Sequence, residues 1–153
     1  AGAPDPLMDE LEALKDQAAR QEEKYLRLAA EYDNFRKRTA KEKEAIWNDA
    51  KADAALAFLP VYDNLERALK QETADEAYKK GVEMTMNQLK TVLEKLGITE
   101  IEALGQPFDP ALHNAVMHIE DENFGENTVA EVFQAGFRLG DKVVRFAMVK
   151  VAN

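Results

Sequence analysis

Two histidines, His113 and His118, are the side chains best suited to act as a base or to bind a metal near neutral pH. Metal-binding pairs are usually three or four residues apart on a helix face or two apart on a strand face, whereas these two are five apart. Asp109 lies near His113, but Asp109-Pro110 is typical of a turn in which the aspartate accepts backbone amides. We therefore predict a structural hydrogen bond for His113 and no metal site.

Covalent nucleophiles are scarce. The chain contains no serine and no cysteine, so only six threonines could attack a substrate. The absence of cysteine also excludes disulfides and cysteine zinc sites, and it fits a reducing compartment. We expect a protein that is not an enzyme and needs no cofactor. A small hydrolase or isomerase that uses threonine, histidine and carboxylates is the alternative from the enzyme class.

Basic side chains gather in one short stretch, at Arg36, Lys37, Arg38, Lys41 and Lys43. This cluster has three interpretations: a nucleic-acid stripe, a docking patch for a partner protein, or a solvated helix face. Glu42 and Glu44 interrupt the cluster, and the whole chain carries a net charge of −9, so phosphate backbones and anionic lipids would be repelled. We expect neither a nucleic-acid nor a membrane partner.

The sequence also lacks the signals of a membrane protein. No stretch approaches the roughly 18 consecutive apolar residues of a membrane span, and no charged-then-apolar leader is present. We expect a soluble, cytoplasmic protein. Residues 1–5 are predicted to be a disordered start.

A very long helix is predicted for residues 6–59, because no glycine or proline occurs between Pro6 and Pro60. Asp5 followed by Pro6 is a typical helix start. Apolar positions recur at steps of three and four, with polar interruptions at Gln21 and Glu42. The positions of this stripe are Leu7, Leu11, Leu14, Ala18, Tyr25, Leu28, Tyr32, Phe35, Thr39 and Ile46. The pattern favours a self-pairing coiled coil; a solitary charged helix stabilised by Glu–Lys pairs is the alternative.

Two bundle helices are predicted for residues 60–97. Pro60 should break or kink the long helix, and Thr73 with Glu76 reads as a capping box for the last helix, which Gly97 would end. Two short helices cannot bury their apolar faces alone, so we predict a dimeric four-helix bundle. The dimer contacts would include Leu11, Leu14, Leu28, Leu65, Leu69, Leu89 and Leu93.

A small all-β module is predicted for residues 98–153, where short β-rich runs alternate with turns. The runs are 98–102, 115–119, 128–133, 137–139, 142–146 and 147–151. Turn residues separate them at 105–107, 123–125 and 140–141. The predicted fold class is therefore α+β, with a long helix, short bundle helices and a C-terminal β module.

Several ordered motifs resemble one family along nearly the whole chain. The run AEYDNFRKRT (residues 30–39) resembles the coiled-coil segment of the GrpE nucleotide exchange factors, and LPVYDNLERAL (59–69) resembles their first bundle helix. In the β module, FDPALHNAV (108–116), GFRL (136–139) and VRFAMV (144–149) resemble the family signature. This resemblance marks Phe108, Asp109, Pro110, His113 and Gly136 as signature residues.

The resemblance implies a homodimer that binds the nucleotide-binding domain of a DnaK-type chaperone and accelerates ADP release, after which ATP rebinds and substrate leaves. It implies no small-molecule substrate of the protein's own. The residues expected to contact the chaperone are Arg36, Lys37, Gly81, Lys142, Arg145 and Met148. Among these, Arg145 is predicted to be an exposed interface anchor, and Lys142 a weaker one.

Two questions stay open at this point. Many GrpE relatives carry a small residue or proline where this chain has Phe146, and we predict that this aromatic ring is buried beneath the module. The second question is the partner, because a fold does not determine what it binds. A coiled-coil tether whose β module binds another protein is therefore the alternative function.

Overall fold

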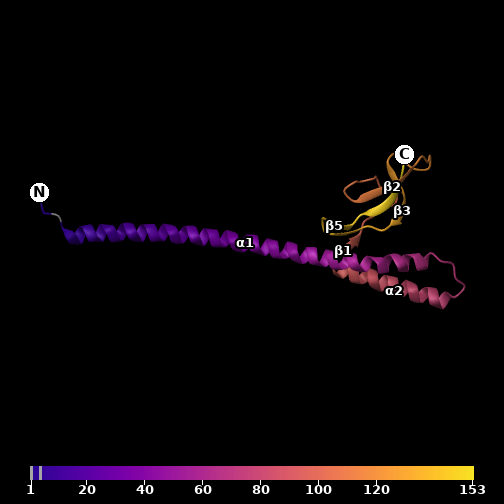
Figure 1. Ribbon diagram of the computed structural model, residues 1–153, viewed down its shortest axis with the longest axis horizontal. Coiled ribbons are helices and arrows are strands. Elements are labelled where there is room, and N and C mark those ends of the chain that lie inside the picture. Colours follow the sequence, from indigo (N-terminus) through magenta and orange to yellow (C-terminus); the bar gives the residue numbers. More distant parts are fainter. Residues whose placement is uncertain (1, 4) are drawn as a thin grey trace. The chain divides into compact units, whose positions relative to one another are not determined.

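The computed structural model describes residues 2–3 and 5–153, so the predicted disordered start at residues 1–5 falls partly outside the described residues. Two helices, α1 (Pro6–Leu69) and α2 (Glu76–Lys95), precede six strands (Figure 1). The strands are β1 (Ile98–Glu100), β2 (His113–Ile119), β3 (Thr128–Gln134), β4 (Phe137–Leu139), β5 (Lys142–Arg145) and β6 (Ala147–Ala152). This set of helices and strands confirms the predicted α+β fold class. The chain divides into two units, residues 1–46 and residues 47–153.

The first unit contains the N-terminal part of α1. Asp5 caps the helix as predicted, because its Oδ1 accepts a hydrogen bond from the Leu7 amide at 3.0 Å. Within residues 6–46 only Asp33 and Thr39 are even partly buried. The apolar stripe is therefore in solvent within a single chain: Leu7 is 74% exposed and Leu28 is 64% exposed. Ion pairs three and four residues apart, such as Arg27–Glu23 at 3.1 Å, support the helix locally.

Helix α1 continues through Pro60, so of the break or kink predicted at that residue the break is wrong. Proline lacks the amide hydrogen that would bond to the carbonyl four residues earlier, which usually costs about 3 kcal/mol inside a helix. Ala55 and Leu59 before Pro60, and Tyr62 after it, are all buried in one core. Each large buried side chain contributes about 1.5–3 kcal/mol, so burial on both sides offsets the cost of Pro60. The helix ends only at Leu69.

The N-terminal cap of α2 is Asp75, not the predicted Thr73. The Asp75 carboxylate accepts a hydrogen bond from the Tyr78 amide at 3.0 Å, and its negative charge suits a helix N-terminus. Thr73 instead accepts a hydrogen bond from the Asp75 amide at 3.1 Å, which orders the turn before the cap. At the other end, Gly97 follows the last turn with φ of 81°, which confirms the predicted glycine cap.

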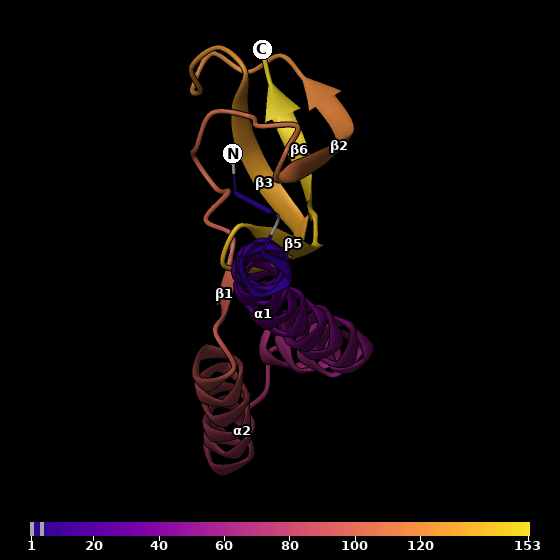
Figure 2. The same ribbon diagram turned by 90° about the vertical axis from the view of Figure 1, so that its left-hand side faces the viewer.

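The β module consists of two three-stranded sheets. In the first, β4 lies between β1 and β5, and all neighbours are antiparallel. In the second, β6 lies between β2 and β3, parallel to β2 and antiparallel to β3 (Figure 2). All six predicted β runs are strands, although β2 begins at His113, two residues before the predicted start. The turn prediction between them is confirmed as well.

Two hydrophobic cores hold the second unit together. The first joins α1, α2 and the sheet that contains β4, and its buried residues are Ala55, Leu59, Tyr62, Met86, Leu93, Ile98, Ala135 and Phe137. The second fills the module under the sheet that contains β6, with Ala103, Val129, Ala147, Val149 and Val151 buried. The first core therefore joins the helices of residues 47–153 to the β module. The surface residues described below lie on the elements that this core holds together.

Candidate partner-binding surfaces

Arg145 is not the exposed residue that the sequence predicts. Its guanidinium donates two hydrogen bonds to the Asp63 carboxylate on α1, at 2.7 and 2.8 Å. Nε and Nη2 also donate to the Ala135 carbonyl, at 3.0 and 2.6 Å, and the guanidinium lies 5.7 Å from the Phe137 ring centroid. Only 14% of the Arg145 side chain is exposed. The local sequence of β5 does not reveal this role, because Asp63 is 82 positions away in the chain.

Lys142, at the other end of β5, pairs with a second carboxylate of α1. Its ammonium lies 2.6 Å from Asp49 Oδ1, and 44% of the lysine side chain remains exposed. Asp49 and Asp63 are about four helical turns apart and therefore lie on the same side of α1. A buried stripe of α1 lies between them, formed by Ala52, Ala55, Leu59 and Tyr62. Sequence reasoning missed both aspartates, although their spacing around this apolar stripe is visible in the sequence.

Tyr62 belongs to the same contact between α1 and the module. Its ring packs edge-on against Phe137, with ring centroids 4.9 Å apart and an interplanar angle of 81°. Its hydroxyl donates a hydrogen bond to Glu100 at 3.4 Å. Burial raises the pKa of Tyr62, and the nearby carboxylates of Glu100 and Glu66 raise it further. The hydroxyl therefore stays protonated and remains a donor.

The outer face of the sheet formed by β2, β6 and β3 carries a mixed apolar and basic surface. Residues alternate along β6, so the partly buried Met148 and Lys150 face away from the core that holds Val149. Lys150 pairs with Glu131 at 2.7 Å and lies 5.5 Å from the Phe133 ring centroid. Phe133 is 41% exposed, and Met117, opposite Lys150 in the register, is 50% exposed. We call Met117, Phe133, Met148 and Lys150 the outer sheet patch.

The signature loop before β2 is built around His113, as predicted. The Asp109 amide donates a hydrogen bond to His113 Nδ1 at 3.0 Å, and Asp109 Oδ1 accepts one from the Ala111 amide at 2.9 Å. Phe108 lies beside the imidazole, with ring centroids 5.9 Å apart, and Pro110 sits in the turn. Burial lowers the pKa of His113 despite the opposing effect of Asp109. The histidine is therefore a neutral structural residue.

Phe146 is 47% exposed, so the prediction of a buried ring is wrong. It lies between β5 and β6, directly before Ala147, which is fully buried. Because neighbouring residues of an extended chain point to opposite sides, burial of Ala147 turns Phe146 outward.

Gly136 is required by a close backbone approach. A Cβ atom at this position would lie 2.4 Å from the Ala147 amide nitrogen and 2.9 Å from Ala147 Cα. Any side chain would therefore push the start of β6 away from the segment between β3 and β4. This explains the glycine in the signature by packing rather than by contact with a partner.

Gly81 in α2 has the opposite surroundings. A Cβ atom there would meet no other atom of the described residues within 4 Å. No other helix of the described residues therefore closely approaches Gly81. Glycine costs about 0.5–1 kcal/mol relative to alanine inside a helix, and nothing in the described residues offsets this cost.

In the first unit, Arg36 and Lys37 share the carboxylate of Asp33, at 3.2 and 2.8 Å. The hydrogen bond and charge of Lys37 lower the pKa of Asp33, and Asp33 in turn raises the pKa of Lys37. Arg38 pairs instead with Glu42 at 3.7 Å and lies 5.7 Å from the Phe35 ring centroid. Each of these three basic side chains is more than 60% exposed, so each is accessible for an intermolecular contact.

The leucines predicted for dimer contacts fall into three groups. Leu11, Leu14 and Leu28 are exposed, whereas Leu65, Leu69 and Leu89 are partly buried at the edge of the first core. Leu93 is 4% exposed inside that core, so within one chain its side chain is almost fully covered. A shallow groove between α1 and α2 exposes apolar surface, lined by Val61, Leu65, Thr85, Gln88, Leu89 and Val92.

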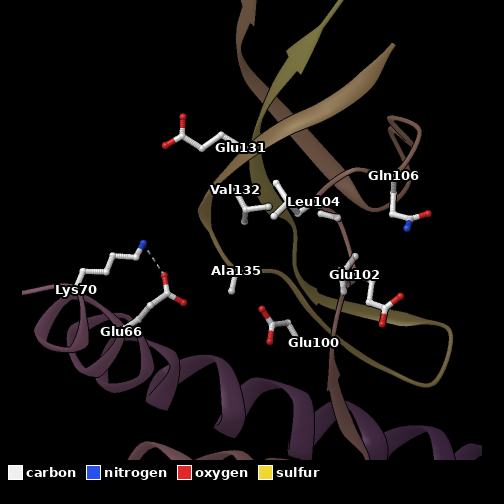
Figure 3. Close-up of a pocket in the computed structure, with 11 residues that line it drawn as sticks. Glu66, Lys70, Glu100, Glu102, Leu104, Gln106, Glu131, Val132 and Ala135 are labelled. Atoms are coloured by element: carbon white, nitrogen blue, oxygen red, sulfur yellow. Dashed lines mark hydrogen bonds and ion pairs between the residues drawn. The ribbon is translucent and has the colours of Figure 1, made fainter. Parts of the chain in front are cut away.

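A cleft between the last turns of α1 and residues 100–106 is strongly acidic (Figure 3). Its carboxylates come from Glu66, Glu100, Glu102 and Glu131, and its one cation, Lys70, pairs with Glu66 at 3.4 Å. Such a field repels phosphate groups, so the cleft does not suit a nucleotide. Across residues 2–3 and 5–153 no group of three or more histidines and carboxylates is arranged to hold a metal ion.

Neither α1 nor α2, which are the helices of the described part of the chain, combines the length and apolar character needed to cross a bilayer. Exposed apolar side chains lie on the N-terminal part of α1, in the groove between α1 and α2, and on the outer sheet patch. These features define the class: an α+β protein whose surfaces suit contacts with other proteins.

Comparison with known proteins assigns the family. A sequence model of the GrpE family matches residues 4–153. Protein GrpE of Clostridium acetobutylicum is 58% identical over 94% of this chain and 68% of its own length. Protein GrpE of Clostridium beijerinckii is 57% identical over 86% of this chain, and that of Bacillus velezensis is 46% identical over 94%. The chain belongs to the GrpE family, whose members are nucleotide exchange factors and co-chaperones of DnaK-type chaperones. It spans 63% of the Clostridium beijerinckii protein and 75% of the Bacillus velezensis protein.

Proposed function

We propose that this chain acts as a homodimer that binds the nucleotide-binding domain of a DnaK-type chaperone and accelerates the release of ADP. ATP then rebinds, and the chaperone releases its substrate. The observation that carries this proposal is the match to the GrpE family over residues 4–153, with 58% identity to the protein of Clostridium acetobutylicum. The relatives named above are bacterial, and we place the action of this chain in the cytoplasm, with its chaperone partner.

The mechanism is one of differential binding. A protein that binds the nucleotide-empty chaperone more tightly than the ADP-bound chaperone must weaken ADP binding by the same factor. It shifts the chaperone population toward the open, empty state and makes or breaks no covalent bond. The absence of serine and cysteine and the acidic character of the cleft agree with a protein that neither hydrolyses nor holds the nucleotide itself.

A second copy of the chain would cover two surfaces that one chain leaves in water. The first is the apolar stripe of α1 that contains Leu11, Leu14 and Leu28. The second is the groove between α1 and α2, where Val92 is 48% exposed. Pairing of the stripe as a coiled coil and of the two grooves as a four-helix bundle would bury both. We therefore propose the homodimer as the working unit.

We propose that chaperone contacts come from the outer sheet patch around Met148, from Lys142 on β5, from Gly81 on α2, and from Arg36 and Lys37 on α1. Met148 and its neighbours combine exposed apolar side chains with a cation, a composition typical of protein interfaces. The open space over Gly81 leaves room for a partner. Arg145 is left out of this set, because Asp63 and Ala135 occupy its guanidinium.

The direct test is the release of a fluorescent ADP analogue from a DnaK-type chaperone with and without this protein. We expect faster release that saturates with protein concentration. Met148→Glu should weaken chaperone binding by more than about 1 kcal/mol, because it places a charge in an apolar contact. Glu122→Gln, in an exposed loop of the module, is the matched control and should bind like the wild type. Binding without faster release would reject the exchange function and favour a tether.

A further inference from the structure

The contact between β5 and α1 is built differently from the other ion pairs of the chain. Arg145 uses four of its five N–H donors within the chain, two on the Asp63 carboxylate and two on the Ala135 carbonyl. Gln134 donates a further hydrogen bond to Asp63 Oδ2 at 3.3 Å. The Arg145 and Asp63 side chains are only 14% and 22% exposed. In every other ion pair of the described residues, at least one side chain is 52% or more exposed.

This geometry restricts direction as well as distance. A two-pronged arginine–carboxylate pair holds both groups near one plane, unlike the point charge of a lysine. Ala135 and Phe137 flank Gly136 in the short segment that leads into β4, so the guanidinium links that segment, β5 and α1 at one place. Lys142–Asp49 adds a second, more exposed contact at the other end of β5. Between the two contacts lies the buried stripe of α1 that includes Leu59.

We propose that Asp63 and Arg145 are positioning residues that hold the β module at a fixed angle on the helices, and that Arg145 promotes exchange through Asp63 without touching the chaperone. This inference rests on the proposed exchange function. In residues 47–153, Gly81 on α2 and Met148 on β6 are both proposed to contact the chaperone. A fixed angle lets binding of the module act on the ADP site through one rigid body. A loosely held module would still bind through its own contacts but would transmit less of the effect on ADP.

The first readout is the spread of orientations, measured without the chaperone. The chain has no cysteine, so Asp53→Cys on α1 and His118→Cys on β2 provide two unique sites for spin labels. Labelled chain is diluted with unlabelled chain so that distances within one copy are measured. We expect Asp63→Asn and Arg145→Gln to broaden the distance distribution. Lys70→Gln, which breaks the Lys70–Glu66 pair at the C-terminal end of α1, is the matched control and should leave the distribution unchanged.

The second readout separates positioning from direct contact by ADP release at saturating protein. Asp63→Asn and Arg145→Gln should each lower the maximal release rate about fivefold or more. The half-saturating concentration should change by less than about twofold, because the residues that touch the chaperone are retained. Exchanging the partners, with Asp63→Arg and Arg145→Asp together, should recover part of the rate. Lys70→Gln should behave like the wild type.

Two results would overturn the proposal. One is an unchanged distance distribution and rate for Asp63→Asn. The other is a raised half-saturating concentration for Arg145→Gln with an unchanged distribution, which would indicate direct contact with the chaperone. If these variants lose their fold by circular dichroism, Arg145→Lys decides the question in the same two readouts, since it keeps the charge but loses the two-pronged geometry. If the wild type does not accelerate ADP release, the exchange function fails, while the distance distributions still test the positioning pair.

Discussion

Leu28 in the helical segment 6–46 is 64% exposed, whereas Val149 in the β module is fully buried. The contrast extends over both units of the chain. In residues 6–46 no described side chain is fully buried, while residues 47–153 contain two hydrophobic cores. The helical segment therefore draws its stability within one chain from backbone hydrogen bonds and exposed ion pairs, and the second unit draws it from burial.

This difference in burial distinguishes residues 47–153, which one chain can stabilise by itself, from residues 6–46, which bury almost nothing within one chain. Exposed ion pairs such as Arg27–Glu23 contribute at most about 0.5 kcal/mol each, too little to hold a long helix firmly. In the second unit, the buried side chains on both sides of Pro60 are sufficient to keep α1 helical through that residue. We therefore expect substitutions in residues 47–153 to change the unfolding free energy strongly and independently of protein concentration. Substitutions in residues 6–46 should have effects that are small or that depend on association of the chain.

The largest effect is expected from Leu59→Ala in the first core. Leu59 is 1% exposed, and removing its side chain leaves a cavity that should cost about 2–5 kcal/mol of unfolding free energy. Leu56→Ala, three residues earlier on the same helix, is the matched control, because Leu56 is 43% exposed and should cost about 0.5 kcal/mol. Urea unfolding of both variants measures the difference. Equal losses would show that burial does not stabilise this part of α1.

Gly136→Ala should destabilise the β module by about 1–3 kcal/mol, because the added Cβ collides with the backbone of Ala147. Gly81→Ala adds the same methyl group where nothing lies within 4 Å. It should stabilise α2 by about 0.5–1 kcal/mol. Thermal unfolding of the two variants, monitored by circular dichroism, gives the comparison. A Gly136→Ala protein as stable as the wild type would refute the close approach.

The helical segment should unfold before the second unit on heating, in a transition of its own. Gln21→Leu with Glu42→Leu should raise this lower transition by roughly 5 °C, since both replace polar residues in the apolar stripe. Glu44→Leu, off the stripe, is the control and should not raise it. If the lower transition rises but the temperature at which ADP release declines does not, the helical segment is a spacer and not a thermal regulator of exchange.

A smaller effect is expected from acidification, because it acts on one buried group of the β module. The pKa of His113 is lowered by burial, so the unfolded chain binds more protons than the folded chain below the ordinary pKa of about 6.5. The stability that the neutral histidine contributes is present above that pH and is lost as the pH falls through the lowered folded pKa. Urea unfolding between pH 7 and about 5 should show this loss in the wild type and in His118→Gln. His113→Gln should flatten the pH dependence; an unchanged slope would contradict the assignment.

Local patterns in the sequence were sufficient to predict most elements of the fold. Alternating β-rich runs and turn residues predicted six strands, and Gly97 at the end of an apolar helical pattern predicted the end of α2. The hydrogen bond of His113 was also predictable, because Asp109 and Pro110 define its loop within four residues. These features depend on neighbours in the sequence.

The errors concern contacts between distant segments. Arg145 was predicted to be exposed, but Asp63, on another element, buries it. Pro60 was predicted to break or kink α1, but the helix does not break there, because Ala55, Leu59 and Tyr62 on both sides of Pro60 are buried in the core shared with α2 and β4. In each case a contact with residues distant in the sequence determines the burial of the side chain or the continuity of the helix. Local sequence patterns do not identify such contacts.

Sedimentation equilibrium of the intact chain at micromolar concentration tests the central claim most directly, because we propose that a second copy of the chain covers the apolar stripe that is exposed in residues 6–46. One chain has a mass of 17.2 kDa. We predict a particle with twice that mass, in which the apolar stripe of residues 6–46 is paired. A particle of 17.2 kDa across the micromolar range would contradict the account, since the exposed leucines of α1 would then have no partner.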